Sequence, residues 1–594
     1  MKKRTSADLA NEKSLSKLMF KLLPIQVLLS LIVVLNGIIS SLFASNFIDI
    51  KAMSAVGLYA PILMLLGSIN LMLVSGSTIL CGECMGKNQI QEMRGVFSLD
   101  MAATFFIALV FSIGIFLLGK FQLVGFFTHE KELRPAFSTY LIGQSIGVIP
   151  FLFGNQLSSF LSLENKMRRN IVSSAAFIVA NLFFNFLFVQ RMQMGVWGLS
   201  LASSLAAWVF FFVQAPCFLT NKSQFKFSAK NIHMKNLGQI LKIGCPGALS
   251  NGCQTLRGLI VNRLLDIYVG AAGLSAFCAA NSFMTLVWCV PAGMVAVSRM
   301  VMSVGIGEED RTAVANVMRV MFKKFCLLNS IMAAVIILSA APLASLFYKD
   351  VSSSVFMMTV WGFRLLPLSL VPGSILQHFV CYGQASGKSI FVQLISVLDG
   401  VVFVSLWTAL LIPSVGMNSV YLANVLNGLC ILAVILLHSI ICNKGFPRNM
   451  EELMVMPDSF GAPESERLEM SVKGIDDVVN LSKKVQDFCI ERRVDQRRAF
   501  LAGLSLEEMA GNVVSHGFNK DKKSHSLEVR AIHKDQDVIL RVRDDCVLFD
   551  PMARLSSQVD GDVTKNIGIR MVCAMAKSVN WQSIFGLNVL TVKI

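Results

Sequence analysis

The chain has 594 residues, of which 54% are hydrophobic and only 15% are charged, and its mean hydropathy is +0.63. This excess of apolar sequence excludes an ordinary water-soluble protein and indicates a lipid bilayer as the main solvent. The formal net charge of +16 would suit a nucleic-acid-binding protein. Here, however, Lys and Arg gather in short loops beside apolar runs, which is typical of membrane topology, so no nucleic acid partner is expected.

Apolar runs long enough to cross a bilayer recur as far as residue 442 and then stop. They predict an all-α polytopic bundle of about 12 helices, at residues 17–43, 53–80, 97–118, 136–161, 170–190, 195–219, 240–268, 273–303, 318–347, 353–382, 389–412 and 416–442. Alternate loops carry the basic residues, which favours a cytoplasmic position for these loops and for both termini. The sequence therefore predicts a multi-pass protein of the cell membrane.

The two halves of the bundle repeat each other, because Pro24 and Pro246, like Pro150 and Pro372, are 222 residues apart. Six helices per repeat give two parallel lobes with a cleft between them. The predicted organisation is a cytoplasmic N-terminus (1–16), a first six-helix lobe (17–220), a cytoplasmic linker (221–239), a second six-helix lobe (240–445), a linker (446–470) and a soluble α+β domain (471–594).

Several segments of the bundle carry a family resemblance. They are IDIKAMSAVGLYAPI, LKIGCPGALSNG, GKNQIQEMRGVF and GIGEEDRTAV. With their spacing they resemble the multidrug and toxic compound extrusion (MATE) family, from about Ser14 to Asn443. The resemblance implies export of small organic compounds by alternating access, driven by H⁺ or Na⁺. Members of the family carry acids where this chain has Ser41, Gln254 and Ser374, which leaves the coupling ion and transport itself open.

Few ionisable residues lie inside the predicted spans, where each costs roughly 2.5 to 3.5 kcal/mol at a helix centre. Asp399 is a candidate site for a cation, or alternatively the buried partner of Arg257 or Arg364. His378 is a further intramembrane candidate. Asp100, Asp266 and Arg299 lie near span ends, where snorkelling to water is expected. The candidate transport residues are Asp399, Gln377, Asn181, Asn185 and Arg257.

The pair Asn181 and Asn185 lies one helical turn apart and resembles polar residues of the family's fifth helix. Such residues either take part in transport or join helices by hydrogen bonds. Gln377 repeats Gln156 of the first lobe.

Beyond the bundle, apolar periodicity predicts helices at 474–493 and 495–516, two strands in SLEVRAIH and DVILRVRD, a helix at 567–579 and a closing hairpin. The segments LAGLSLEEMAGNVVSHGF, VRDDCVLFDP and TKNIGIRMVCAMAK resemble, in order, the boxes of histidine-kinase-like (GHKL) ATPases of the anti-sigma-factor serine kinase type. The resemblance implies a Bergerat-like ATPase sandwich that binds ATP and Mg²⁺.

Individual residues take roles from this resemblance. Asn512 would complete Mg²⁺ coordination through ATP, and Glu508, four residues earlier on the same helix face, would orient or deprotonate an attacking hydroxyl as the catalytic residue. Asp544 would accept the adenine amino group, and Gly568 would open a helix whose amides receive phosphate. Cys546 and the pair Lys565 and Asn566 replace glycines of the family, and the Cys546 side chain is expected to crowd the nucleotide.

The leading hypothesis is therefore a MATE-type transporter regulated by an ATP-binding domain. ATP is expected to regulate and not to drive transport, because the chain lacks the phosphate-binding motif G-x-x-x-x-G-K-[ST] of ABC pumps. One alternative is a transport-inactive sensor that controls a protein serine kinase, with an anti-sigma-antagonist-like protein as partner. Another is a flippase for lipid-linked saccharides. The kinase resemblance also implies a homodimer.

Overall fold

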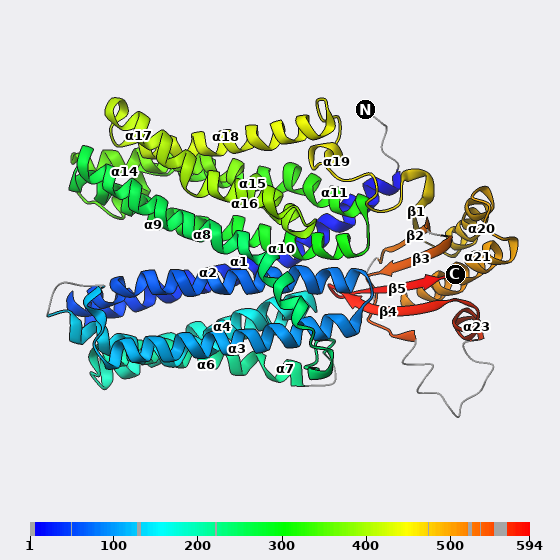
Figure 1. The fold of residues 1–594 in the computed structure, drawn as a ribbon, viewed down its shortest axis with the longest axis horizontal. Helices are drawn as coiled ribbons and strands as arrows, with labels where there is room; N and C mark the ends of the chain where they lie inside the picture. The colour runs from blue at the N-terminus through cyan, green and yellow to red at the C-terminus, as the bar shows by residue number, and fades with distance from the viewer. Residues whose placement is uncertain are drawn as a thin grey trace.

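The computed structural model describes residues 6–48, 50–126, 132–219, 223–472, 474–518, 520, 525–534, 536–551 and 567–594. The side chain of Ser41, the pair Lys565 and Asn566, and the first five residues of the predicted N-terminus lie outside this description. A long helical bundle forms most of the molecule, and a small sheet with its helices sits at one end of it (Figure 1). We call that end of the bundle the domain end, and the opposite one the far end.

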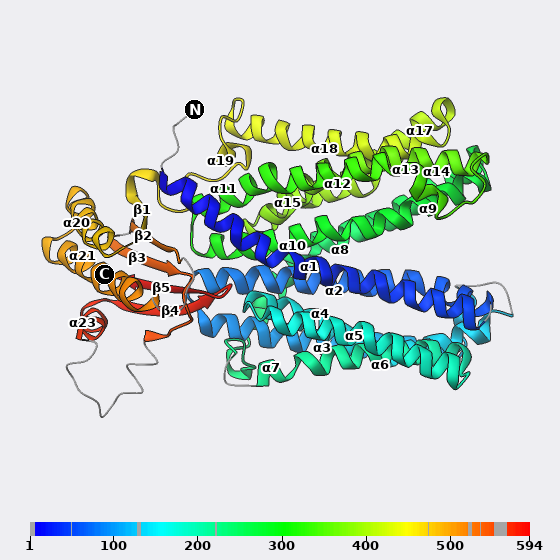
Figure 2. The same ribbon diagram turned by 180° about the vertical axis from the view of Figure 1, so that it is seen from behind.

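The first lobe contains the blue and cyan helices of Figures 1 and 2. Its elements are α1 (Ser6–Phe47), α2 (Ile50–Gly86), α3 (Ile90–Lys120), η1 (Val124–Phe126), α4 (Arg134–Leu163), α5 (Met167–Asn185), η2 (Phe186–Arg191), α6 (Gly195–Gln214) and α7 (Pro216–Leu219). Gly86, at the end of α2, lies at the domain end, and α1 crosses from this lobe to pack along the second (Figure 2).

The second lobe contains the green and yellow helices of Figure 1. Its elements are η3 (Ala229–Asn231), α8 (Met234–Tyr268), α9 (Ala271–Val287), α10 (Cys289–Gly307), α11 (Arg311–Val320), η4 (Met321–Phe325), α12 (Cys326–Leu338), α13 (Ala340–Ser345), α14 (Ser354–Leu365), η5 (Leu366–Ser369), α15 (Leu370–Ala385), α16 (Ser389–Val397), η6 (Leu398–Val402), α17 (Phe403–Val415) and α18 (Asn418–Asn443). Several predicted spans thus consist of two consecutive elements, such as α9 with α10.

Within the described residues, 11 helical segments are long and apolar enough to cross a membrane. The predicted number of about 12 spans is larger by one, and the additional predicted span is α8. This helix has 35 residues and packs along α2, but Lys242, Arg257 and Arg263 make it too polar to qualify by composition. The bundle is mostly helical and of the membrane type, as predicted.

The two lobes meet closely at the domain end. A Cβ atom on Gly86 of α2 would lie 2.3 Å from the carbonyl oxygen of Val304 on α10, and one on Gly307 would lie 2.1 Å from that of Glu83. Glycine is therefore required at these positions for the helix backbones to touch. Toward the far end of α2 and α8, a Cβ on Gly57 or Gly258 would have no atom within 4 Å.

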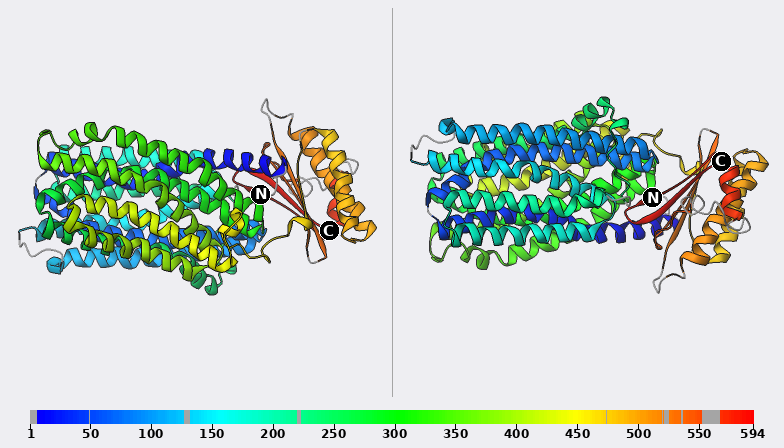
Figure 3. Two further views of the ribbon diagram at one scale, coloured as in Figure 1. Left: turned by 90° about the horizontal axis from the view of Figure 1, so that it is seen from above. Right: turned by 90° about the horizontal axis from the view of Figure 1, so that it is seen from below.

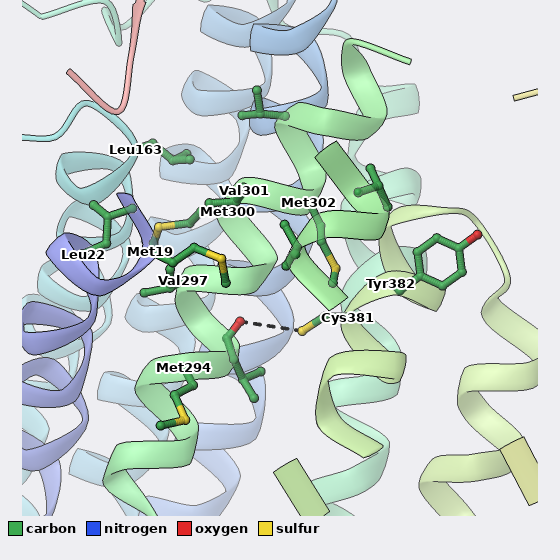
Figure 4. Close-up of a cluster of buried hydrophobic side chains, with 14 of the residues drawn as sticks. Met19, Leu22, Leu163, Met294, Val297, Met300, Val301, Met302, Cys381 and Tyr382 are labelled. Atoms are coloured by element: carbon green, nitrogen blue, oxygen red, sulfur yellow. Dashed lines mark hydrogen bonds between the residues drawn. The ribbon is translucent and has the colours of Figure 1, made fainter. Parts of the chain in front are cut away.

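Methionine, valine and leucine side chains fill the contact between the lobes (Figure 4). Met19 of α1 and Met300 of α10 are both buried there, with Cys381 of α15, whose thiol approaches the carbonyl oxygen of Val295 at 3.9 Å. Methionine adapts its shape easily, so this core suits two surfaces that pack against each other without covalent bonds.

The C-terminal unit is a five-stranded antiparallel sheet in the order β1-β2-β3-β5-β4. Its elements are α19 (Met450–Leu453), η7 (Glu464–Glu466), β1 (Arg467–Val472), α20 (Ile475–Glu491), α21 (Gln496–Asn512), η8 (Val513–Gly517), β2 (Leu527–Lys534), β3 (Asp537–Asp544), α23 (Ile567–Met575), β4 (Ser578–Ile584) and β5 (Leu587–Lys593). The helices α20, α21 and α23 cover the sheet face that points away from the bundle (Figure 3).

The helices and strands predicted in this unit agree with the structure to within a few residues, because each has a clear apolar period. Strand β1 was not predicted, and it begins at Arg467, inside the segment expected to be a linker at 446–470. Its six residues, RLEMSV, alternate between polar and apolar, so the signal of a short strand was present in the sequence. The structure contains the predicted sheet and its helices, and the assignment of this unit as an ATPase sandwich stays a prediction.

Candidate functional site

The structure brings two of the predicted transport residues together in the second lobe. Asp399 lies half-buried in the π-helical turn η6, and its Oδ1 accepts a hydrogen bond of 2.7 Å from Asn427 Nδ2. Its carboxylate also interacts electrostatically with the guanidinium of Arg257 on α8. Asp399 therefore has a cationic partner inside the protein. Gln377 is half-buried on α15, beside the fully buried His378.

The two predicted asparagines belong to a separate polar group in the first lobe. Asn181 and Asn185 are fully buried on α5. Asn185 Nδ2 donates to the backbone oxygen of Asn181 over 2.9 Å, and Asn181 Nδ2 donates to Oδ1 of Asn36 on α1. The bond from Asn181 to Asn36 joins α5 to α1 inside one lobe.

Two expectations about charged residues are wrong. Arg364 is exposed and lies over the ring of Trp361, 5.3 Å from its centroid, so it is not a buried charge. Asp100 was expected to reach water from the end of a span, but it is fully buried. Helix α3 begins at Ile90, about ten residues earlier than Asp100, and the neighbouring helices α2 and α4 cover this carboxyl group.

The predicted nucleotide residues of the C-terminal unit lie on neighbouring helices. Glu508 and Asn512 stand on α21, and the Asn512 amide donates to the backbone oxygen of Glu508 over 2.7 Å. A Cβ on Gly568 of α23 would lie 1.7 Å from Glu508 Oε2. The Glu508 carboxylate thus sits at the N-terminus of α23, where the helix dipole favours an anion and where only glycine leaves room.

Asp544 ends strand β3 and is held by its neighbours. Its Oδ1 accepts hydrogen bonds from Asn588 Nδ2 at 2.8 Å and from the backbone N–H of Cys546 at 3.0 Å. Burial raises the pKa of Asp544, and these hydrogen bonds oppose that shift because they favour the ionised form. Asn588 on β5 was not identified from the sequence, where a single asparagine in a strand carries no signal.

The Cys546 side chain is buried, and a Cβ on Gly517 would lie 3.0 Å from its Sγ, so the thiol packs against the end of η8. That it crowds a nucleotide stays a prediction. Cys546 also lies close to His525 and Asp545, with potential metal-ligand atoms of the three residues within 4.8 Å of one another.

Ion pairs connect the C-terminal unit to the second lobe. Glu308, in the loop between α10 and α11, is paired with Arg543 Nη2 at 2.7 Å and with Arg541 Nη1 at 3.4 Å. Asp310 of the same loop is paired with Arg530 Nη1 at 2.7 Å. Burial opposes ionisation of Asp310, but Arg530 and the other nearby donors outweigh it and lower the pKa of this carboxyl group.

The hairpin of β4 and β5 connects the same unit to the first lobe. Its tip, Phe585 and Gly586, has positive φ angles of 53° and 78°, as in the tight two-residue turn that favours glycine. Phe585 is 3% exposed and belongs to the core of the bundle. Behind the tip, Gln582 Nε2 donates to the backbone oxygen of Met85 on α2 over 2.6 Å. The unit therefore touches both lobes where they meet.

Comparison with known proteins gives matches in the membrane part. Residues 26–187 match the family model MatE. The chain is 26% identical over 248 residues to the "Uncharacterized transporter YisQ" of Bacillus subtilis (strain 168), an alignment that covers 40% of this chain and 53% of that protein. The chain thus spans about half the length of this curated relative.

Solved structures match over a longer range. An outward-facing multidrug resistance MATE family transporter of the MOP superfamily is similar at TM-score 0.66 and 17% identity, over 73% of this chain and 97% of that one. The Vibrio cholerae MATE transporter VcmN in its bent form has TM-score 0.66 and 18% identity, over 71% and 97%. A MOP superfamily transporter from Pyrococcus furiosus, whose binding pocket has reverse polarity, has TM-score 0.64 and 16% identity, over 73% and 98%. The membrane part of the chain has the MATE fold, and residues 26–187 within it match the MatE family model.

Proposed function

We propose that the chain is a MATE-type membrane transporter that exports small organic compounds by alternating access, driven by a cation gradient and regulated by its C-terminal unit. The observation that carries the proposal is the close contact between the lobes at the domain end. Their backbones touch there at Gly86 and Gly307. Alternating access needs two such states, with the contact at opposite ends.

The domain end is the cytoplasmic side in this proposal. Lys and Arg residues of the loops gather at that end, as the positive-inside rule requires. Lys87, in the loop between α2 and α3, lines a pocket there between the two lobes, together with Lys235 and Lys242 of α8. With the domain end closed, the arrangement is the state that is open to the outside.

We propose ATP with Mg²⁺ as the ligand of the C-terminal unit. Two features fit this ligand. Asp544 is buried, and its Oδ1 accepts a hydrogen bond from Asn588. The N-terminus of α23 lies beside the Glu508 carboxylate, which a phosphate group can replace. Asn512 would hold Mg²⁺ through ATP, and Asp544 would select adenine. When bound, ATP supplies negative charge at α23 and would displace Glu508 from it.

Regulation follows from the position of the unit across both lobes. In the inward-open state the domain ends of the lobes must separate, so the sheet has to release either Glu308 or the hairpin contact at Met85. Asn588 lies two residues after the hairpin tip and bonds Asp544 directly. A ligand at Asp544 is therefore one hydrogen bond away from the strand that reaches into the bundle.

Transport is tested with purified protein in proteoliposomes that contain ethidium as a probe cation. We expect efflux that depends on an imposed proton or sodium gradient, and we expect Gly86→Val to abolish it, because the added side chain prevents closure at the domain end. The matched control is Gly114→Val on α3, since a Cβ there meets no atom within 4 Å. Absence of gradient-driven efflux of every organic cation and anion tried would reject transport.

Nucleotide binding is tested by calorimetry of Mg²⁺–ATP with the full-length protein. We expect Asp544→Asn to weaken binding by roughly 10- to 100-fold, because a hydrogen bond to a charged group contributes about 1.5 to 3 kcal/mol. Asn512→Ala is expected to remove the Mg²⁺ dependence. Asp487→Asn, on the exposed face of α20, is the control and should bind as the wild type does. Equal affinities for Asp544→Asn and the wild type would reject the nucleotide site.

A second function is favoured by the same contacts between the C-terminal unit and the bundle. If the bundle does not transport, its contacts with β2, β3 and the hairpin would let a change in the membrane part control the C-terminal unit as a protein serine kinase. If no efflux is measured but the protein binds ATP, this second function is favoured over transport.

A further inference from the structure

Three side chains with metal-binding donor atoms gather where strands β2 and β3 meet the loops of the C-terminal unit. They are His525, Asp545 and Cys546, which offer a ring nitrogen, a carboxylate oxygen and a thiol sulfur. These donor atoms all lie within 4.8 Å of one another. None of the three side chains has a role in the functions proposed above.

The register of the sheet brings the three residues together. The antiparallel pairing of β2 and β3 ends at the first residue of β2 and the last residue of β3. Continued outward by two residues, the same register places His525 opposite Cys546, and residues in such positions have Cβ atoms about 4.5 to 5.5 Å apart. Between them, the Ser526 N–H donates to Asp545 Oδ1 over 2.8 Å. The donor atoms are therefore held by the ends of two paired strands.

The sulfur and nitrogen donors are shielded from solvent. The side chain of His525 is 4% exposed and Cys546 is 6% exposed, whereas the Asp545 side chain is 28% exposed. The ring of Phe518 lies 5.8 Å from the ring of His525, measured between centroids. On the other side, a Cβ on Gly517 would lie 3.0 Å from Cys546 Sγ. An ion can enter at the exposed part of the Asp545 carboxylate.

The separations suit a site that contracts slightly around an ion. Zn²⁺ binds a Cys sulfur at about 2.3 Å, and a His nitrogen or a carboxylate oxygen at about 2.0 to 2.2 Å. In a tetrahedral arrangement such donors lie about 3.4 to 3.6 Å from one another. His525 Nδ1 and Asp545 Oδ1 are 3.2 Å apart. A movement of roughly 1 Å by the Cys546 side chain is enough to bring its sulfur to the distance that Zn²⁺ requires.

The donor set favours zinc over magnesium and calcium. Mg²⁺ and Ca²⁺ take oxygen ligands, so a site with one sulfur and one nitrogen suits neither. A thiolate, an imidazole and a carboxylate are ordinary ligands of Zn²⁺. Three side chains of the described residues contribute donors, which leaves the fourth tetrahedral position to water. Because the thiolate is the ligand, binding of the ion releases the thiol proton of Cys546 to solvent.

We propose that His525, Asp545 and Cys546 form a Zn²⁺-binding site at the ends of β2 and β3. The site goes beyond transport and ATP binding and depends on neither. It gives a reason for a cysteine at a position where the ATPases that this unit resembles carry a glycine. The backbone N–H of Cys546 donates to Asp544 Oδ1 over 3.0 Å, so bound Zn²⁺ also fixes the loop that follows Asp544.

Metal binding is tested by titrating the purified full-length protein, first stripped with a chelator, with Co²⁺ and then with Zn²⁺. Co²⁺ is the probe because a bound thiolate gives it a strong charge-transfer band in the near ultraviolet, and colourless Zn²⁺ displaces it. We expect one Co²⁺ per chain with this band, and Cys546→Ser should lose the band. His525→Asn and Asp545→Asn should each weaken Zn²⁺ binding at least about 100-fold, because even the loss of an outer-shell partner costs about 10- to 100-fold.

Thermal unfolding without metal verifies that the variants are folded. Zn²⁺ should raise the unfolding temperature of the wild type and leave that of Cys546→Ser unchanged, since a ligand stabilises only a protein that binds it.

Cys442→Ser is the matched control. Cys442 is exposed on α18, and its Sγ lies 3.8 Å from both ring nitrogens of His438, so it offers a thiol beside an imidazole elsewhere in the molecule. This variant should keep the Co²⁺ band of the wild type. The proposal is overturned if excess Co²⁺ gives no band, if the band persists in folded Cys546→Ser, or if it is lost in Cys442→Ser. His525 and Asp545 then form a hydrogen-bonded pair and no metal site.

Discussion

Replacing Glu308 with Arg is expected to detach the C-terminal unit from the second lobe. The Glu308 side chain is only 2% exposed and is paired with Arg541 and Arg543, so the variant places three cations together in a buried position. Breaking a buried pair by removing one partner costs about 3 to 5 kcal/mol. We expect amide hydrogen exchange in β4, β5 and the domain ends of α2 and α10 to become at least about tenfold faster, measured by mass spectrometry.

Exchanging the charges at the ion pairs distinguishes the loss of these pairs from a general loss of folding. Glu308→Arg combined with Arg541→Glu and Arg543→Glu restores opposite charges at the junction, and slow exchange should return in part. Glu491→Arg makes the same charge change at the exposed end of α20, where its carboxylate is 74% exposed, and should leave exchange unchanged. If Glu308→Arg exchanges like the wild type, the ion pairs do not hold the unit on the bundle.

The sequence predicted well what depends on the length and period of apolar segments. The bundle follows from apolar runs long enough to cross a bilayer, and the helices and strands after residue 474 follow from patterns of period 3.6 or 2. Glu508 and Gly568 lie close together on α21 and α23, and the nucleotide roles assigned to them stay predictions. Asp399 interacts electrostatically with Arg257, which was one of the alternatives left open for it, and its role in transport stays a prediction.

Features that arise from packing between distant segments were not predicted. Asp100 was expected to reach water because only its distance from a span end could be counted, not the helices that cover it. The arginines Arg541 and Arg543 alternate with apolar residues, which is typical of a solvent-exposed strand face. They face Glu308 instead, more than 230 residues earlier in the chain. One signal was present: the loop with Glu308, Glu309 and Asp310 is acidic where basic residues are expected.

Replacing Asn588 with Ala is expected to disconnect the nucleotide site from the hairpin. Asn588 is 6% exposed and uses both ends of its amide: Nδ2 donates to Asp544 Oδ1, while Oδ1 accepts from the backbone N–H of Phe549 at 3.0 Å and from Trp581 Nε1 at 3.3 Å. The variant removes one hydrogen bond from each of these three groups, and a buried group that stays unsatisfied costs about 1 to 3 kcal/mol. We expect Mg²⁺–ATP to bind roughly 5- to 100-fold more weakly in calorimetry.

The loss of coupling is distinguished from the loss of affinity by saturating the variant with ATP. In the wild type, ATP should change hydrogen exchange at the hairpin tip around Phe585, because Asp544 and the tip are joined through Asn588. In Asn588→Ala the same ligand occupancy should leave the tip unchanged. Asn580→Ala, at an exposed position of β4, is the matched control and should respond like the wild type. If the hairpin still responds to ATP without Asn588, the signal reaches the bundle by another route. One such route runs through Arg543, which is next to Asp544 in the chain and is paired with Glu308.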